Sequence, residues 1–172
     1  PRPFLVIATQ NPAGASGTQP LPDSQLDRFL LRLTLGYPSP EDELELLRRR
    51  RSGLPMEGVR QVAGQAELEG LCRAADAVYL SDEVLDYIVR LVGATRDHPL
   101  IVQGGSPRAT LAVAAVSRAA ALVQGRDYVI PEDVAGLFRD VVTHRLLLAP
   151  GVREGQDPVG DVLRTVQPPR LR

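Results

Sequence analysis

The sequence contains no lysine, and all 20 of its basic residues are arginines. A phosphate-binding P-loop needs a lysine after its glycines, and a Schiff-base enzyme needs a lysine amine, so these 172 residues supply neither. The single cysteine, Cys72, excludes an internal disulfide and a Cys-x-x-Cys metal or redox site. The two histidines, His98 and His144, lie far apart without the spacing of metal ligands, so we expect no metal site.

Tryptophan is also absent and aromatic residues make up only 4% of the chain, so the core must be built from Leu, Val and Ala. Such a composition suits close-packed helices, and 44% hydrophobic with 24% charged residues is typical of a globular protein. No apolar run reaches the roughly 18 residues that a membrane span needs, and no signal peptide is visible, so we expect a cytoplasmic protein. A net charge of -1 argues against nucleic-acid binding.

The first 36 residues have the pattern of a parallel α/β domain. The apolar run at residues 4–8 predicts a buried strand, and residues 29–35 predict a second one. A Gly/Pro-rich loop and a short helix at residues 23–28 separate them. Because two strands cannot form a stable sheet covered on both faces, we expect residues 1–36 to be the C-terminal part of a larger α/β core. The chain also lacks an initial methionine, so we expect it to be a segment of a longer protein.

Residues 37–148 have a helical pattern instead. Serine and proline mark helix starts, as at Ser106-Pro107, and Gly125 marks a helix end. The expected helices span residues 40–50, 65–76, 82–94, 107–124 and 131–145. With short connections they predict a small bundle, giving a mostly α member of the α+β class. Residues 149–172 are expected to be a C-terminal tail with one further helix near 159–166.

Asn11 directly follows the first predicted strand. Ligands of open α/β sheets lie just outside the carboxyl ends of the strands, where an amide can donate to a phosphate and orient a water. The simpler interpretation, which dipeptide patterns favour, is that Asn11-Pro12 only begins a turn.

Arg28 ends the short helix, between Leu26 and Phe29. If these two apolar residues anchor the backbone, the guanidinium is held rigidly and can stabilise developing phosphate charge. A local salt bridge to Asp27 or Asp23 is the alternative, and it is the commoner role of a surface arginine.

Arg108 occupies the second position of the helix that Pro107 begins. A cation there opposes the helix dipole, so its presence suggests an anionic partner nearby. A surface arginine tolerated at modest cost is the equally weighted alternative.

Three other features have structural interpretations. The run at residues 48–51 places four arginines at a helix end, where cations are favourable, and Glu45 precedes Arg49 by four residues. Cys72 has apolar neighbours along its helix and is predicted to fill the core. His144 is predicted to be structural, with a protonated imidazole that favours the end of its helix.

Taken together, several stretches resemble the MoxR family of AAA+ ATPases. They are Phe-Leu-Val-Ile-Ala-Thr-Gln-Asn-Pro at residues 4–12, Gly17-Thr18, and Leu-Pro-Asp-Ser-Gln-Leu-Asp-Arg-Phe-Leu-Leu-Arg-Leu at residues 21–33. Gly-Gly-Ser-Pro-Arg-Ala at residues 104–109 and Tyr-Val-Ile-Pro-Glu-Asp-Val at residues 128–134 are similar to the lid of the same family.

The resemblance implies roles for three residues. Asn11 would be sensor 1, near the γ-phosphate of ATP, and Arg28 would be the arginine finger that reaches the nucleotide of a neighbouring subunit. Arg108 would be the sensor 2 arginine on the helical lid, which would span residues 37–148. Family members form rings, typically hexamers, and act as chaperone-like machines on partner proteins, often ones with von Willebrand factor A domains.

The Walker A and Walker B segments of that family are absent from the sequence. The resemblance therefore implies ATP and Mg²⁺ as ligands only when these residues are joined to a catalytic front half, and the chain alone is expected to be inactive. A second hypothesis stays open, in which the chain is a non-enzymatic helical module that binds a partner protein in a groove.

Overall fold

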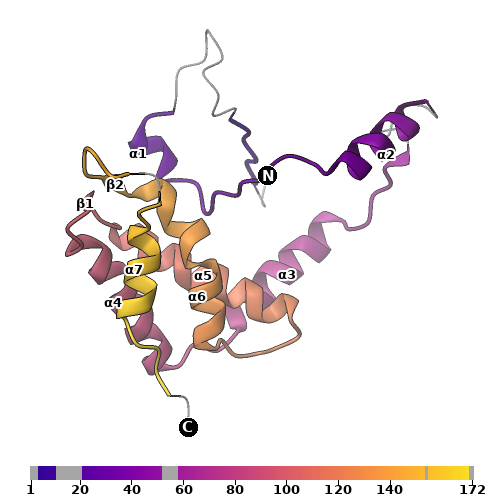
Figure 1. Cartoon of the computed structure of the whole chain (residues 1–172). Helices are drawn as coiled ribbons and strands as arrows, with labels where there is room; N and C mark the ends of the chain where they lie inside the picture. The colour runs from indigo at the N-terminus through magenta and orange to yellow at the C-terminus, as the bar shows by residue number, and fades with distance from the viewer. Residues whose placement is uncertain (1–3, 11–20, 52–57, 154, 171–172) are drawn as a thin grey trace.

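A computed structural model describes residues 4–10, 21–51, 58–153 and 155–170 of the chain. Its main body is a helical bundle in which α4 (Asp82–Arg96), α5 (Pro107–Val123) and α6 (Pro131–Val142) pack on one another (Figure 1). The short helix η2 (Thr143–Arg145) continues α6, and α7 (Pro158–Thr165) packs against α4 and α6. The expected fold class, a mostly helical protein with little sheet, is confirmed.

Local signals set the ends of the bundle helices. The Ser81 hydroxyl accepts a hydrogen bond from the backbone N–H of Val84 at 3.4 Å and so caps α4. Pro107 begins α5 and Pro131 begins α6, at the first helical position where the missing N–H costs nothing. Gly125 follows the end of α5. Its φ of 75° is the left-handed conformation that glycine adopts freely and that stops a helix.

The core is made almost entirely of aliphatic side chains, as the scarcity of aromatic residues predicts. Its fully buried members come from all three central helices: Val84, Tyr87, Ile88, Leu91, Val92, Ala109, Val113, Ala121, Val134, Phe138, Val141 and Val142. On α4, Val84, Ile88, Leu91 and Val92 recur at spacings of three and four residues, so one face of the helix supplies the core.

A two-stranded antiparallel sheet was not predicted from the sequence. Strand β1 (Ile101–Gln103) pairs with β2 (Leu147–Leu148), with Ile101 opposite Leu148. The sheet joins the segment before α5 to the segment after η2. Consequently the beginning of α5 and the end of α6 lie at the same end of the bundle (Figure 1).

The two strands predicted near the N-terminus are wrong for the described residues. Residues 4–10 and 29–35 have no regular secondary structure, and Phe4 and Ile7 are largely exposed. A strand forms only where a second strand satisfies its backbone, and in the described part of the chain β1 and β2 pair only with each other. The short helix between the two segments does form, as α1 (Asp23–Leu26).

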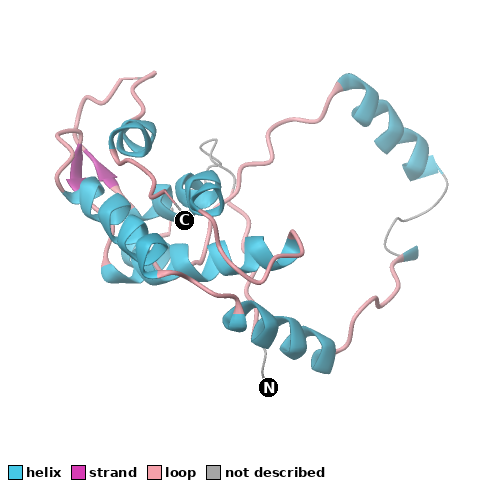
Figure 2. Cartoon of the chain, turned by 90° about the horizontal axis from the view of Figure 1, so that it is seen from below, coloured by secondary structure: helices cyan, strands magenta, loops and turns pink. Residues whose placement is uncertain are grey.

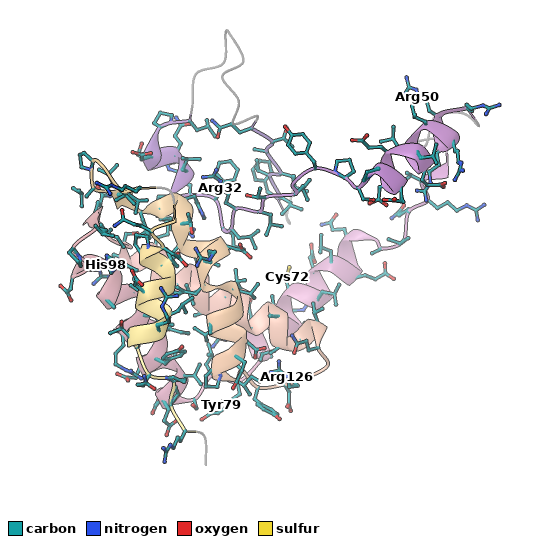
Figure 3. All side chains as sticks on the ribbon, viewed as in Figure 1. Arg32, Arg50, Cys72, Tyr79, His98 and Arg126 are labelled. Atoms are coloured by element: carbon teal, nitrogen blue, oxygen red, sulfur yellow. The ribbon has the colours of Figure 1, made fainter. Side chains whose placement is uncertain are left out.

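Helix α2 (Pro40–Arg51) stands apart from the bundle, and the two views agree on this (Figures 1 and 2). None of its residues is buried. Its basic end is as predicted, and Arg49 Nε lies 2.9 Å from Glu45 Oε1 one turn earlier. Arg50 is on the outer end of this helix in Figure 3.

Helix α3 (Gln65–Ala77) lies at the edge of the bundle, where it contacts α5. The prediction that Cys72 fills the core is wrong, because its side chain is exposed on α3 (Figure 3). Apolar neighbours along one helix do not determine burial, since a helix at an edge is covered on one side only.

Helix α7 falls within the residues predicted to form the C-terminal tail. Val159 and Val162 of this helix join the hydrophobic core. Arg139 of α6 donates two hydrogen bonds to the carboxylate of Asp157, at 2.8 and 2.6 Å, just before α7 begins. Asp157 in turn accepts a hydrogen bond from the backbone N–H of Gly160 and caps the helix.

Candidate functional site

The beginning of α5 is held tightly against α4 by two glycines. The Gly105 N–H donates to Thr95 Oγ1 at 2.9 Å, and Arg96 Nε donates to the Gly105 carbonyl at 2.8 Å. A Cβ atom on Gly104 would lie 2.6 Å from the backbone N and Cα atoms of Arg96, so this position admits only glycine without a shift of the backbone. The Gly-Gly pair therefore fixes where the helix, and Arg108 on it, begins.

Arg108 lies at the second position of α5, as predicted, and its side chain is 55% exposed. The anionic partner expected for it is an aspartate: Arg108 Nη1 lies 3.4 Å from Asp27 Oδ2. At this length and exposure the contact is a weak ion pair. The guanidinium is thus anchored at one atom and can exchange its partner for another anion.

Asp27 is a polar residue of this region that the sequence analysis did not place in a site. Its Oδ1 lies 3.2 Å from Arg145 Nε and 3.5 Å from the hydroxyl of Ser106, in addition to the Arg108 contact of Oδ2. Ser106 precedes α5 but does not cap it with its side chain. One carboxylate therefore joins α1, the beginning of α5 and η2. These contacts span 79 to 118 residues of sequence, so no local pattern indicates them.

Arg145 is the buried member of this group, with a side chain that is only 2% exposed. Besides the Asp27 carboxylate, it donates to the carbonyl oxygens of Phe29, Leu30 and Val141. Burial lowers the pKa of Arg145, and the charge of Asp27 opposes that shift. Because a buried guanidinium needs both a counter-charge and filled donors, this network ties residues 27–30 firmly to the end of α6.

The contacts between residues 27–30 and the end of α6 with η2 form a joint. His144 of η2 belongs to this joint, which is a structural role of the kind predicted for it. Its Nε2 lies 3.0 Å from the Phe29 carbonyl oxygen, which identifies Nε2 as the protonated nitrogen. The environment disfavours the predicted protonated state: burial lowers the pKa of His144, and Arg145 and Arg32 add to this, whereas the Phe29 hydrogen bond and the charge of Asp27 oppose it. Its Nδ1 is buried and has no partner among the described residues, which fits a neutral ring.

Arg28 follows Asp27 directly, beyond the end of α1, and its side chain is exposed. The alternative interpretation, a salt bridge to Asp27 or Asp23, is not observed. No hydrogen bond or ion pair of the Arg28 side chain is found within the described parts of the chain. Its backbone is nevertheless fixed, because the neighbours on both sides, Asp27 and Phe29, are bound by Arg145.

The remaining predicted site residue, Asn11, lies outside the described residues. Across residues 4–10, 21–51, 58–153 and 155–170, no group of three or more His, Cys, Asp or Glu side chains is arranged to hold a metal ion. Within the same ranges, no helix is long and apolar enough to cross a membrane.

Two family descriptions match the chain, and each covers one of the two segments that contact each other through Asp27 and Arg145. Residues 1–31 match the ATPase family associated with various cellular activities (AAA), and residues 93–166 match the AAA lid domain. Asp27 and Arg28 lie in the first match, whereas Arg108 and Arg145 lie in the second.

Individual relatives extend the likeness over nearly the whole chain. An uncharacterised Bacillus subtilis protein, YeaC, is 38% identical over 99% of this chain and 54% of its own length. The chaperone MoxR1 of Mycobacterium tuberculosis is 43% identical over 86% of this chain and 41% of its own length. The crystal structure of a candidate ATPase from Cytophaga hutchinsonii superposes with a TM-score of 0.85 at 32% identity, covering 96% of this chain and 53% of the other.

The chain thus spans about half the length of the relatives that it matches. The likeness covers both the segment with Arg28 and the helices with Arg108, in the same order along the chain. From these matches, the chain belongs to the MoxR family of AAA+ ATPases.

Proposed function

We propose that this chain supplies the arginine finger and the lid of an ATP-hydrolysing ring protein, and that the complete protein uses hydrolysis to remodel or activate partner proteins. The observation that carries the proposal is the pair of arginines next to Asp27. Arg28 is exposed and has no polar partner among the described residues, and Arg108 is weakly held at the start of α5. Both cations are available to a phosphate.

The two arginines would act on different nucleotides. Arg108 is on the lid, so it would contact the terminal phosphate bound by its own subunit, where the free N–H groups at the start of α5 also favour an anion. Arg28 would reach the nucleotide of the neighbouring subunit and stabilise the charge that develops on the transferred phosphoryl group. Asn11, after the first apolar run, would orient the attacking water.

The residues of this chain suit the terminal phosphate but not the whole nucleotide. The sequence has no P-loop lysine, and the described residues contain no carboxylate cluster for Mg²⁺. We therefore assign the contacts to Mg²⁺ and to the β-phosphate to other parts of the complete protein. Mg²⁺ bound there would neutralise phosphate charge, whereas this chain would supply the two cations that respond to the γ-phosphate.

The role proposed for Arg28 also determines how the protein would assemble. Because Arg28 would complete a site on another subunit, hydrolysis requires a homo-oligomer, and we propose a hexameric ring in the cytoplasm. The remodelled partners would be other proteins, among them those with von Willebrand factor A domains.

The test is turnover and nucleotide affinity of Arg28→Ala in the complete protein. Turnover should fall by about 10³-fold or more, as for other arginine fingers, while the Kd for ATP stays within about twofold. Arg164→Ala is the matched control, since Arg164 is an exposed arginine whose ion pair in the described part of the chain is with Asp161 on its own helix. Wild-type turnover in Arg28→Ala would remove the finger assignment.

A further inference from the structure

Asp27 has no role in the function proposed above, yet it lies between the two arginines that do. It precedes Arg28 in the chain, and its carboxylate contacts Arg108 and the buried Arg145. We propose that Asp27 is a positioning residue that couples Arg108 to Arg28, so that the finger segment (residues 27–32) and the lid move together. This inference rests on the proposed function, because it assumes that both arginines act on phosphate.

The two ion pairs of Asp27 differ sharply in strength. Arg145 is buried, lies 3.2 Å from the Asp27 carboxylate and also donates to the carbonyls of Leu30 and Phe29, so its pair with Asp27 is the better shielded from water. Arg108 is exposed and 3.4 Å away through a single atom, so that contact is weak. Asp27 can therefore lose its contact with Arg108 and still be held to the lid by Arg145.

The charges at the joint favour such an exchange of partners. One carboxylate faces two guanidinium groups, those of Arg108 and Arg145. The terminal phosphate of ATP carries more negative charge than Asp27 and accepts paired hydrogen bonds from a guanidinium. When Arg108 turns to phosphate, Asp27 keeps Arg145 as its counter-charge. The Asp27 carboxylate thus competes with nucleotide for Arg108. When nucleotide binds Arg108, the carboxylate still has its ion pair with Arg145.

The finger segment is attached to the lid along its length. Besides the Arg145 contacts, the Arg32 N–H donates to the Asp140 carbonyl of α6 at 2.8 Å, and His144 of η2 contacts the Phe29 carbonyl. Leu31 packs against the hydrophobic core of the bundle. A lid that closes on its own nucleotide through Arg108 would therefore carry Arg28 with it, towards or away from the adjacent site.

The experiment is Asp27→Asn in the complete protein, with turnover and the Kd for a non-hydrolysable ATP analogue measured separately. Asparagine keeps the shape of aspartate and removes its charge. Without a competing carboxylate, Arg108 is free, so the analogue should bind about two- to fivefold more tightly, the equivalent of one weak exposed ion pair. Turnover should fall about ten- to hundredfold, because the ion pair with Arg145 that helps to hold the residue next to Arg28 is lost.

Asp23→Asn is the matched control. Asp23 lies on the same short helix, is exposed, and has no side-chain ion pair in the described structure, so both constants should stay at wild-type values. Tighter binding with slower turnover distinguishes positioning from general damage to the fold, which would weaken both. Weaker analogue binding in Asp27→Asn, or turnover equal to that of Asp23→Asn, would overturn the proposal.

A measurement on the wild-type protein decides the matter if Asp27→Asn does not assemble. Hydrogen exchange of the Arg32 amide, which is bonded to α6, should be equally slow with and without the ATP analogue. Exchange that becomes about tenfold faster with the analogue, while the amides of α6 stay protected, would show that the finger segment separates from the lid. That result would contradict the proposed coupling.

Failure of this inference and failure of the proposed function give different results. If Arg28→Ala and Arg108→Ala both keep wild-type turnover, the proposed function fails whatever Asp27→Asn does. If both lose turnover and Asp27→Asn behaves like Asp23→Asn, the proposed function stands and only the coupling fails.

Discussion

The chain has two regions that both contain many apolar residues but differ greatly in how these residues pack. Residues 78–166 supply all the buried members of the one hydrophobic core in the described parts of the chain. In residues 4–71, by contrast, Leu35 and Tyr37 are 96% and 99% exposed, and the leucines of α2 are exposed as well. Composition therefore does not decide burial. An apolar segment is buried only where a second element presents a complementary face, and α4, α5 and α6 provide such faces for one another.

The finger segment is the exception in the first region. Residues 27–32 lie before α2 in the chain but belong by contact to η2 and α6. Their attachment is polar, through Arg145, His144 and Asp140, with Leu31 as the apolar contribution. The attachment of this segment to the helical bundle therefore ends just after Arg32. The following predictions test this contrast, beginning with the largest expected effect.

Arg145→Ala should destabilise the chain the most. It would remove the buried donor that the Asp27 carboxylate shares with three carbonyl groups, and breaking a buried ion pair costs about 3–5 kcal/mol. Arg49→Ala, which removes an exposed pair on α2, should cost about 0.5 kcal/mol or less. Urea unfolding measures both free energies. Similar losses for the two variants would mean that the joint is not the anchor described here.

Leu91→Ala and Leu46→Ala compare the two regions directly. Leu91 is fully buried on α4, so its truncation should cost about 2–5 kcal/mol in the free energy of unfolding. Leu46 on α2 is exposed, and the same change should cost about 0.5 kcal/mol or less. A large loss for Leu46→Ala would show that α2 is covered in solution and would remove the contrast.

Gly104→Ala and Gly93→Ala test how α5 is placed. The new methyl group at position 104 would meet the backbone of Arg96, and we expect a loss of about 1–3 kcal/mol and weaker ATP binding through Arg108. At position 93 on α4 no atom lies within 4 Å, so alanine should stabilise the helix by about 0.5–1 kcal/mol. Thermal unfolding of both variants checks the signs, and a stabilising Gly104→Ala would contradict the close approach.

Acid should weaken the joint through His144, the smallest of these effects. Burial lowers the pKa of this histidine in the folded chain below its ordinary value of 6.5. The unfolded chain therefore takes up the proton first, so the stability contributed by neutral His144 is present above pH 6.5 and is lost as pH falls below it. His144→Gln should flatten the pH dependence of unfolding between about pH 7 and 5. An unchanged slope would exclude His144 as its source.

The sequence predicts the helices well because their signals are local. The three central helices begin at the predicted residues, Asp82, Pro107 and Pro131, and Gly125 follows the end of α5. The position of Arg108 on α5 follows from these signals. The helix dipole suggested an anionic partner for Arg108 as one of two interpretations, and in the structure the carboxylate of Asp27 lies 3.4 Å from it.

What the sequence does not predict depends on contacts between distant residues. Strands β1 and β2 are too short to show alternation, and each exists only because the other is adjacent. Cys72 was expected to be buried because its neighbours are apolar, but the place of α3 at the edge of the bundle decides its exposure. Asp27 was considered only as a partner for Arg28. The cation at the start of α5 was the one local signal near this contact, and it was equally compatible with an unpaired surface arginine.

The central claim is that Arg28 and Arg108 serve different nucleotides. Mixing two inactive variants of the complete protein, Arg28→Ala and Arg108→Ala, tests it most directly. In a random ring, about one interface in four combines an intact Arg108 on the nucleotide-binding subunit with an intact Arg28 from its neighbour. The account predicts that ATP turnover reappears in the mixture, at roughly a quarter of the wild-type rate. A mixture as inactive as its two components would contradict it.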